Sequence, residues 1–165
     1  MDTLPGIASI VSIQKTNDLS DLEWCARLMS NNEPWITLER PYLSSIHLLQ
    51  DPLSQVYLLT EGNTSLGFVM IKLQGHFTGY IQTIVIIEEA RGKGIGEAAI
   101  KYVEELIFKV SPNVFICVSS FNKRAEQLYL RMGFEKIGVL KNYVKEGYDE
   151  VFMRKTKGPL NDFNK

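Results

Sequence analysis

A glycine-rich stretch, RGKGIG at residues 91–96, separates an apolar run at residues 81–87 from a segment of helical periodicity at residues 95–110. Its three glycines let backbone amides approach a ligand without obstruction from a Cβ atom. The first amides of a helix have no partner within the helix and carry the positive end of its dipole, so they favour an anion. Phosphate oxygens meet both conditions, and the charges of Arg91 and Lys93 add to the attraction. The stretch therefore predicts a phosphate-binding loop rather than a turn that only joins a strand to a helix.

Two cofactor motifs compete for the same glycines. Residues 94–99 fit the dinucleotide fingerprint G-x-G-x-x-A, but residues 88–93 separate them from the preceding strand. The required acidic residue after the next strand is also missing. A Walker loop is excluded because no Gly-Lys-Ser/Thr occurs at the required spacing. Arg91, Gly94 and Gly96 fit the motif R-x-x-G-x-G/A without adjustment, which favours an acyl-coenzyme A (acyl-CoA) site.

Length and composition indicate one domain spanning residues 1–165, with a frayed tail at residues 158–165. The net charge of −1 and the lack of a basic block argue against nucleic acid as a partner. No run approaches the length of a membrane span, and the N-terminus lacks the features of a secretory signal. The cysteines, Cys25 and Cys117, form no C-x-x-C pair and are expected to be small buried side chains in a reducing compartment. With only two histidines, we expect no metal site, and we expect a cytoplasmic protein that binds neither nucleic acid nor membrane.

Hydrophobic periodicity and turn residues divide the chain into helices and strands. Strands are predicted at residues 7–15, 56–61, 66–73, 80–87, 114–118, 135–143 and 150–155, and helices at residues 18–30, 41–50, 95–110 and 122–132. The three strands between residues 56 and 87 follow each other through short turns, which predicts an antiparallel meander. The strand, helix and strand around the glycine-rich stretch predict a parallel pair. The fold class is therefore α/β with a mixed sheet.

A second block of sequence makes the acyl-CoA interpretation specific. Residues 122–134 read N-x-x-A-x-x-L-Y-x-x-x-G-F. With this block, the first motif and the order of the helices and strands, nearly the whole chain resembles the GNAT family of N-acetyltransferases. The resemblance implies the GNAT acyl-CoA N-acyltransferase fold, a twisted mixed sheet of about seven strands flanked by four helices. Residues 142–153 are similar to the ribosomal-protein alanine N-acetyltransferase branch. The implied function is transfer of acetyl from acetyl-CoA to a primary amine on a peptide N-terminus, a lysine or a small molecule.

The resemblance also implies a role for each residue that matches the family's motifs. By that match, the backbone of residues 84–86 pairs with the pantetheine arm, residues 92–97 hold the pyrophosphate, and Asn122 contacts CoA. The implied cofactor-binding residues are Ile84, Val85, Ile86, Arg91, Gly92, Lys93, Gly94, Ile95, Gly96, Glu97, Asn122 and Tyr129. A backbone N–H near Ile86 is implied as the donor that stabilises the oxyanion of acetyl transfer. Tyr129 is implied as the general acid, since a phenol with a pKa of about 10 keeps its proton at neutral pH and can pass it to the departing thiolate.

Several of these side chains also have a purely structural interpretation. Tyr129 can be a half-buried core aromatic, and Asn122 can act as the N-cap of its helix. Trp35 is expected in the core more than in the lining of an acceptor cleft. Tyr143 and Tyr148 lie where the related branch contacts its peptide substrate, although tyrosines are common in strands and turns generally.

The chain departs from the related branch at the proton acceptor, which in that branch is a glutamate on the fifth strand. The matching residue is Cys117, and the nearest acidic alternatives are Glu88 and Glu89, which can act only through an ordered water. We therefore expect no single essential base and a kcat/KM that climbs with pH toward the acceptor's own pKa. A tyrosine pair of the branch is also incomplete, with Val144 as its second member.

Three other functions fit parts of the sequence. A non-catalytic acyl-CoA-binding sensor would bind acetyl-CoA without transferring its acetyl group. A dinucleotide-binding oxidoreductase would use the same glycines for NAD, and a glycine-loop interaction module would bind neither ligand. The sequence also leaves open whether the chain forms a homodimer.

Overall fold

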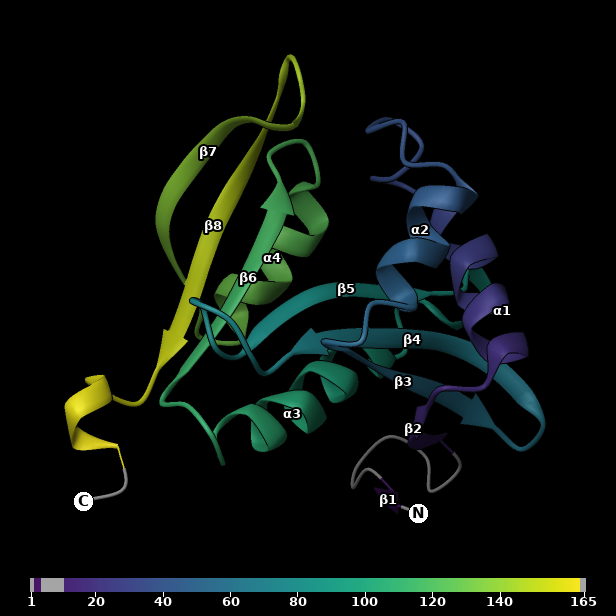
Figure 1. Cartoon of the computed structure of the whole chain (residues 1–165), viewed down its shortest axis with the longest axis horizontal. Coiled ribbons are helices and arrows are strands. Elements are labelled where there is room, and N and C mark those ends of the chain that lie inside the picture. The colour runs from purple at the N-terminus through teal and green to yellow at the C-terminus, as the bar shows by residue number, and fades with distance from the viewer. Residues whose placement is uncertain (1, 4–10, 164–165) are drawn as a thin grey trace.

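The computed structural model describes residues 2–3 and 11–163. Within these residues, eight strands form one sheet in the order β1-β2-β3-β4-β5-β6-β8-β7, flanked by four α-helices and two 3-10 turns (Figure 1). The strands are β1 (Asp2–Thr3), β2 (Val11–Thr16), β3 (Ser54–Glu61), β4 (Thr64–Lys72), β5 (Tyr80–Ile86), β6 (Asn113–Ser119), β7 (Glu135–Lys145) and β8 (Tyr148–Thr156). The helices and turns are α1 (Leu19–Ser30), α2 (Tyr42–Leu49), η1 (Glu88–Ala90), α3 (Ile95–Ile107), α4 (Lys123–Arg131) and η2 (Leu160–Asp162).

The predicted α/β fold is confirmed. The strands β2 to β8 correspond to the seven predicted from periodicity, and β1 is a two-residue addition at the edge of the sheet. The predicted meander is β3, β4 and β5, which pair antiparallel, while β5 and β6 form the predicted parallel pair. Of the strand predicted at residues 7–15, the part from Val11 is observed, and residues 7–10 lie outside the described residues. The predicted tail contains the turn η2 before the description ends at residue 163.

Local sequence explains where the helices begin and end. Asp18 is the N-cap of α1, because its carboxylate accepts from the amides of Ser20 at 2.9 Å and Asp21 at 3.3 Å. The helix α3 ends at Ile107, earlier than the predicted end at residue 110. Beyond that residue, the amides of Lys109 and Val110 bond to carbonyls three residues back, at 3.3 Å and 2.9 Å, which is the 3-10 pattern common at helix ends.

Both faces of the sheet are covered. The helices α1 and α2 pack on one face and α3 packs on the other (Figure 1). Successive side chains of β4 alternate between the two layers, with Phe68 and Met70 under α1 and α2, and Val69 and Ile71 under α3. All four side chains are 0% exposed, and such burial stabilises the fold by about 25 cal/mol for each Å² of apolar surface removed from water. The two layers therefore fix β4 and, through its ladder, β5.

The sheet opens between β5 and β6. These strands pair only at Tyr80 with Phe115 and at Ile81 with Ile116, although both continue for several more residues. A register shift in the β4–β5 ladder between Met70 and Ile71 marks a bulge close to the point of divergence. In Figure 1, β6 and β8 swing away from β5 as one arm of a V. Beyond Ile81, one backbone edge of β5 is therefore not covered by a neighbouring strand.

Candidate active site

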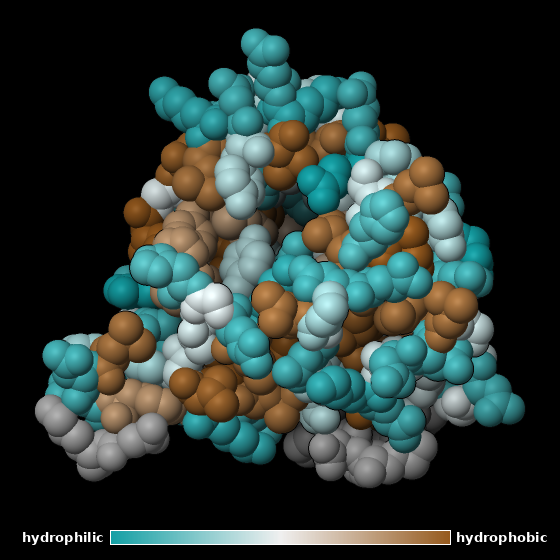
Figure 2. Space-filling model, in the orientation of Figure 1, coloured by the Kyte–Doolittle hydropathy of each residue, from teal (hydrophilic) through white to brown (hydrophobic). Residues whose placement is uncertain are grey.

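A cleft of about 1510 Å³ opens where β5 and β6 diverge. Its lining comes from the segment after α1, β5, the glycine-rich loop, β6, α4 and the hairpin of β7 and β8. Figure 2 shows a hollow between the arm of β6 and β8 and the α1–α2 segment. The cleft therefore brings together the two sequence blocks that carried the functional prediction.

The glycine-rich loop forms the N-terminus of α3. Gly92 and Gly94 have φ values of 73° and 77°, a left-handed region that side chains disfavour, and Gly94 is the N-cap. The first amide bonded within the helix is that of Ala98, at 3.0 Å from the Gly94 carbonyl, so helix geometry leaves the amides of residues 95–97 free. The predicted pyrophosphate residues that line the cleft are Arg91, Gly92, Gly94, Ile95, Gly96 and Glu97. Lys93 is exposed and lies outside this lining.

Arg91 connects the loop to two other parts of the cleft. Its Nε donates to the carbonyl of Ile86 at 3.0 Å, and its Nη2 donates to Oδ1 of Asn32 at 2.6 Å. The guanidinium therefore positions the end of β5 and the segment after α1, a structural role that the sequence analysis did not foresee. Its contact with a phosphate stays a prediction.

One backbone edge of β5 faces the cleft. The amide of Ile87 donates to β4 at 2.9 Å, so residue 87 faces β4. Because successive residues of a strand face opposite edges, the N–H and C=O groups of Ile84 and Ile86 face away from β4. Val85 also lines the cleft, but its backbone faces β4. Of the predicted pantetheine-pairing residues, Ile84 and Ile86 thus have the required orientation, and the Ile86 amide remains the candidate oxyanion donor.

The second sequence block places Asn122 and Tyr129 in the lining of the cleft. Asn122 is the N-cap of α4, since its Oδ1 accepts from the Ala125 amide at 3.3 Å. Tyr129 is 5% exposed and packs against Phe134, with 6.0 Å between ring centroids. The phenol is protonated at neutral pH even at its ordinary pKa, and burial raises that pKa further. Each residue therefore has the structural contact that was expected of it, the helix cap for Asn122 and the core packing for Tyr129. Each also lines the cleft, as its functional interpretation requires.

The cleft contains a buried carboxylate that the sequence analysis missed. Glu150 of β8 lies opposite Ser119 of β6 in the sheet, is 6% exposed and accepts from Ser119 Oγ at 2.7 Å. Burial raises the pKa of the Glu150 carboxyl, and the bond from Ser119 opposes the rise. Alternation along the predicted strand, with Val151 and Met153 in the core, was an available signal that Glu150 faces the other side. Its position beside β6 depends on strand pairing, which no local pattern specifies.

The expectation that Cys117 is a core residue is wrong. The residue is half-buried and lines the cleft, as Tyr80 does. Burial raises the pKa of the Cys117 thiol, so the thiol stays neutral at pH 7. Burial also raises the pKa of the Tyr80 phenol. Cys25 does lie in the core, where burial raises its pKa to about 12.

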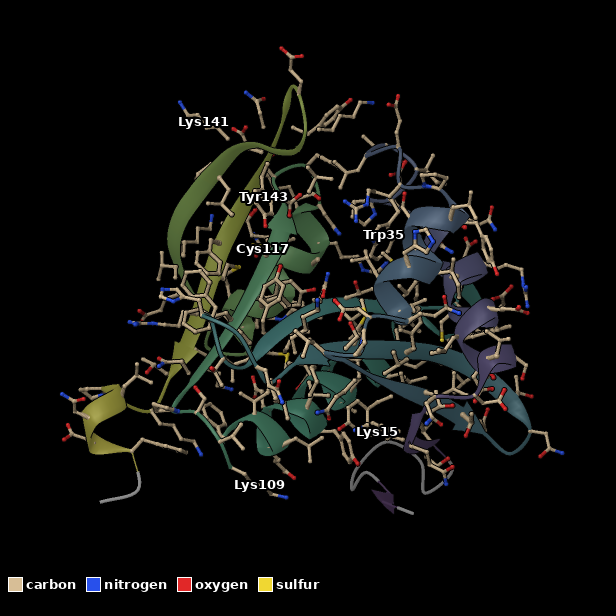
Figure 3. The ribbon with its side chains drawn as sticks, in the orientation of Figure 1. Lys15, Trp35, Lys109, Cys117, Lys141 and Tyr143 are labelled. Carbon is tan, nitrogen blue, oxygen red and sulfur yellow. The ribbon has the colours of Figure 1, made fainter. Side chains whose placement is uncertain are left out.

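The remaining candidates are divided between the cleft and the surface. Trp35 lines the cleft and also packs on the core beneath α1 and α2, so both interpretations hold. Tyr143 lines the cleft from β7, and Figure 3 shows it with Cys117 across the opening from Trp35. Tyr148 instead packs against Phe121 at 5.6 Å between ring centroids. Glu88 and Glu89, the acidic residues that the sequence favoured, are both exposed on η1.

Among residues 2–3 and 11–163, no group of three or more His, Cys, Asp or Glu side chains is arranged to hold a metal ion. None of the helices in these residues has the length and apolar character that crossing a bilayer requires.

The fold and the cleft agree with a comparison to known proteins. The family model of the Acetyltransferase (GNAT) family matches residues 16–134, a span that runs from the end of β2 through both sequence blocks. The chain therefore belongs to the GNAT family of acetyltransferases.

Individual relatives cover different parts of the chain. An uncharacterized N-acetyltransferase of Methanocaldococcus jannaschii is 34% identical over 88 residues, which are 50% of this chain and 56% of that relative. The N-alpha-acetyltransferase RimI of Mycobacterium tuberculosis is 26% identical over 161 residues, covering 95% of this chain and 96% of the relative. The structure of an aminoglycoside 6′-N-acetyltransferase complexed with coenzyme A has a TM-score of 0.72 and 18% identity, covering 91% of this chain and 98% of that one. The predicted similarity to members like the ribosomal-protein alanine N-acetyltransferases is thus confirmed. The N-alpha-acetyltransferase and the aminoglycoside N-acetyltransferase act on different acceptors, so the matches do not identify the acceptor of this chain.

Proposed function

We propose that this chain transfers the acetyl group of acetyl-CoA to a primary amine, by direct attack of the amine on the thioester. The observation that carries the proposal is the cleft, in which the amides of α3, the open edge of β5 and Tyr129 lie together. The acceptor amine belongs to a peptide N-terminus, a lysine or a small molecule. The cosubstrate is acetyl-CoA, and no metal takes part.

The cleft suits the successive parts of acetyl-CoA. The amides of residues 95–97 and the turn at Gly92 and Gly94 suit a pyrophosphate. These N–H groups have no partner within α3 and lie at the positive end of its dipole, so they attract an anion. The edge of β5 at Ile84 and Ile86 suits the amides of a pantetheine arm, which can pair with it as an added strand does. The coenzyme A complex of a protein of the same fold supports this assignment.

Two groups of this chain can assist the chemistry. The amide of Ile86 can donate to the carbonyl oxygen as negative charge develops on it, and a donor of this kind is worth about 2.7–4 kcal/mol in enzymes where it has been removed. Tyr129 holds its proton at neutral pH, as an ordinary phenol does, and burial raises its pKa further. It can give that proton to the sulfur when the carbon–sulfur bond breaks.

The alternatives from the sequence have less support. A non-catalytic sensor would share the CoA site but has no need of a protonated phenol in its lining. A dinucleotide-binding oxidoreductase is disfavoured by the family match, which includes the glycine-rich loop. The cytoplasmic location and the homodimer stay predictions.

Binding and turnover measurements test the proposal together. Calorimetry with acetyl-CoA, CoA and NAD is expected to show binding of the first two ligands and none of NAD. Release of CoA is then followed with a free tripeptide, Nα-acetyl-lysine amide and spermidine as acceptors, and at least one is expected to be acetylated. Tight NAD binding without CoA binding contradicts the proposal, and acetyl-CoA binding without transfer to any amine favours the sensor.

A further inference from the structure

Glu150 differs from the other buried glutamates of the described chain in what surrounds it. Glu104, which is 6% exposed, pairs with Lys155 at 2.9 Å. Glu126, which is 4% exposed, forms ion pairs with Lys123 and Lys136. Both of those carboxylates are therefore neutralised by cations of their own chain.

Glu150 has a hydroxyl partner and no ion pair among the described residues. The titratable groups that interact with it are Cys117 from β6 and Tyr80 from β5, and Tyr143 from β7 lines the same cleft. None of these three groups is a cation. A buried carboxylate without a cation costs stability, because it loses hydration that nothing replaces. Buried titratable groups with perturbed pKa values cluster at functional sites. Glu150 lines the cleft, and none of the four arginines in the described part of that lining forms an ion pair with it.

We propose that Glu150 binds the ammonium group of the acceptor amine in the cleft and takes its proton before the amine attacks acetyl-CoA. The inference rests on the proposed acetyl transfer and names the group that prepares its nucleophile. Glu150 then occupies the role for which the sequence offered only Cys117, Glu88 and Glu89.

The need for such a group follows from the acceptor's own chemistry. An alkyl ammonium has a pKa near 10, so only about one molecule in a thousand is a free nucleophile at pH 7. Cys117 is a poor alternative, since burial raises the pKa of its thiol and little thiolate is present to accept a proton. Burial also raises the pKa of the Glu150 carboxyl, which brings it closer to that of the amine and makes proton transfer less unfavourable.

The protons and bonds of the step balance without a further reactant. Glu150 takes one proton from R–NH₃⁺, and the free amine forms a carbon–nitrogen bond to the acetyl carbonyl. The carbon–sulfur bond then breaks, and the thiolate takes the phenolic proton of Tyr129. The second amine proton, lost as the amide forms, restores Tyr129, and Glu150 releases its proton to solvent. The sum is one acetamide, one CoA thiol and one proton.

The first test compares Glu150→Gln with Glu105→Gln, the same change at an exposed position on α3. We expect Glu150→Gln to lower kcat/KM for the acceptor by about 10²–10⁴ while the Kd for acetyl-CoA stays unchanged, whereas Glu105→Gln matches the wild type. The pH profile is expected to change as well. Wild-type kcat/KM should be flat between the pKa of Glu150 and that of the amine, while the variant should rise about tenfold for each pH unit. A loss of less than about threefold, or the same pH profile for both proteins, overturns the proposal.

The second test needs no turnover, so it separates a failure of this inference from a failure of the proposed function. The midpoint of thermal unfolding is measured with ethylammonium chloride and, as the matched salt, with sodium chloride. Ethylammonium at about ten times its Kd is expected to raise the wild-type midpoint by at least about 2 °C more than sodium does, and to leave Glu150→Gln unaffected. Equal responses of the two proteins overturn the proposal even if acetyl transfer is confirmed. A response confined to the wild type supports it even if the acceptor panel contains no substrate.

Discussion

Tyr129 shows how one side chain can belong to the core and to a reactive cleft. Its ring packs on Phe134, while the residue also lines the cleft. The burial that stabilises the fold also raises the pKa of a phenol that already keeps its proton at neutral pH, so the proton needed by a general acid is present. The two interpretations that the sequence left open are therefore compatible, and only a functional experiment separates a catalytic phenol from a packed one.

Replacement of Tyr129 by phenylalanine removes the proton and keeps the packing. We expect Tyr129→Phe to lower kcat by about 10²–10⁴, with little change in KM for acetyl-CoA, because the lost interaction is made late in the reaction. Tyr57→Phe is the matched control, since Tyr57 lies in the same core cluster and donates to Gln55 at 2.9 Å instead. Steady-state kinetics of both variants check the prediction. An unchanged kcat in folded Tyr129→Phe returns the residue to a purely structural role.

The stability of Glu150→Gln should depend on pH in a defined direction. Burial raises the folded pKa of Glu150 above its unfolded value of about 4.3, so the protonated form stabilises the folded state. That contribution is fully present below the unfolded pKa and is lost as pH rises through the folded pKa. Glutamine cannot ionise, so the variant does not lose this contribution to stability as the pH rises. The variant should therefore unfold at a higher temperature than the wild type at pH 8 and at the same temperature at pH 4, as measured by calorimetry. A constant difference between the two pH values would contradict the assigned burial.

Glu88 and Glu89 are expected to contribute little to catalysis. Both are exposed on η1, so a proton could reach them only through ordered water. Glu88→Gln and Glu89→Gln should each lower kcat/KM by less than about tenfold, below the usual span for a direct base. Steady-state assays with the acceptor that the wild type prefers check this. A hundredfold loss in either variant, with acetyl-CoA binding intact, names that residue as the base.

Among the elements, the loop before α3 combines a strained backbone with a binding surface. Gly94 has a φ of 77° at the N-cap, a conformation in which a side chain costs about 1–2 kcal/mol. The same position presents the free amides of α3 to the cleft. A substitution there should therefore affect both the stability of the fold and the affinity for acetyl-CoA.

Gly94→Val separates the two effects when it is compared with Gly62→Val. Gly62 also has a positive φ, 57°, but lies in the turn between β3 and β4 with open space around its Cβ position. Both variants should lose about 1–2 kcal/mol of stability, while only Gly94→Val should weaken acetyl-CoA and CoA by more than about tenfold, because its side chain obstructs the amides. Chemical denaturation and calorimetry provide the two readouts. Equal affinities in the two variants would show that the loop does not hold the cosubstrate.

In the whole molecule, the half of the sheet from β1 to β5 is joined to the half formed by β6, β8 and β7 by little direct strand pairing. β5 and β6 share two register pairs, and side-chain bonds from Arg91 to Asn32 and from Lys145 to Thr37 connect parts of the cleft wall. A ligand that fills the cleft contacts both halves at once. Binding should therefore stabilise the protein as a unit rather than one half of the sheet.

Acetyl-CoA at about a hundred times its Kd should stabilise the fold by about 2.7 kcal/mol. For a chain of this size the midpoint of thermal unfolding should then rise by about 5–10 °C in a single transition, and NAD should leave it unchanged. Scanning calorimetry with each ligand measures both effects. Two separate transitions, or stabilisation by NAD, would contradict a single CoA cleft shared by both halves.

Much of this architecture is determined locally and was predicted from the sequence. The helix stripe from Ile95, the cap at Asp18 and the turns of the meander are short-range patterns, since periodicity and capping act within one or two turns of chain. The glycine-rich loop and the position of Tyr129 followed from motifs of the same short range. The order of the elements then left few topologies for the sheet.

Features that depend on pairing between distant strands required the folded chain. The divergence of β5 from β6 after two register pairs is a property of the ladder, and neither strand encodes it alone. The contact between Ser119 and Glu150 spans 31 residues and exists because β8 lies between β6 and β7 in the sheet. A one-residue change of register would turn Glu150 to the opposite face, so long-range packing, rather than any local pattern, places its carboxylate in the cleft.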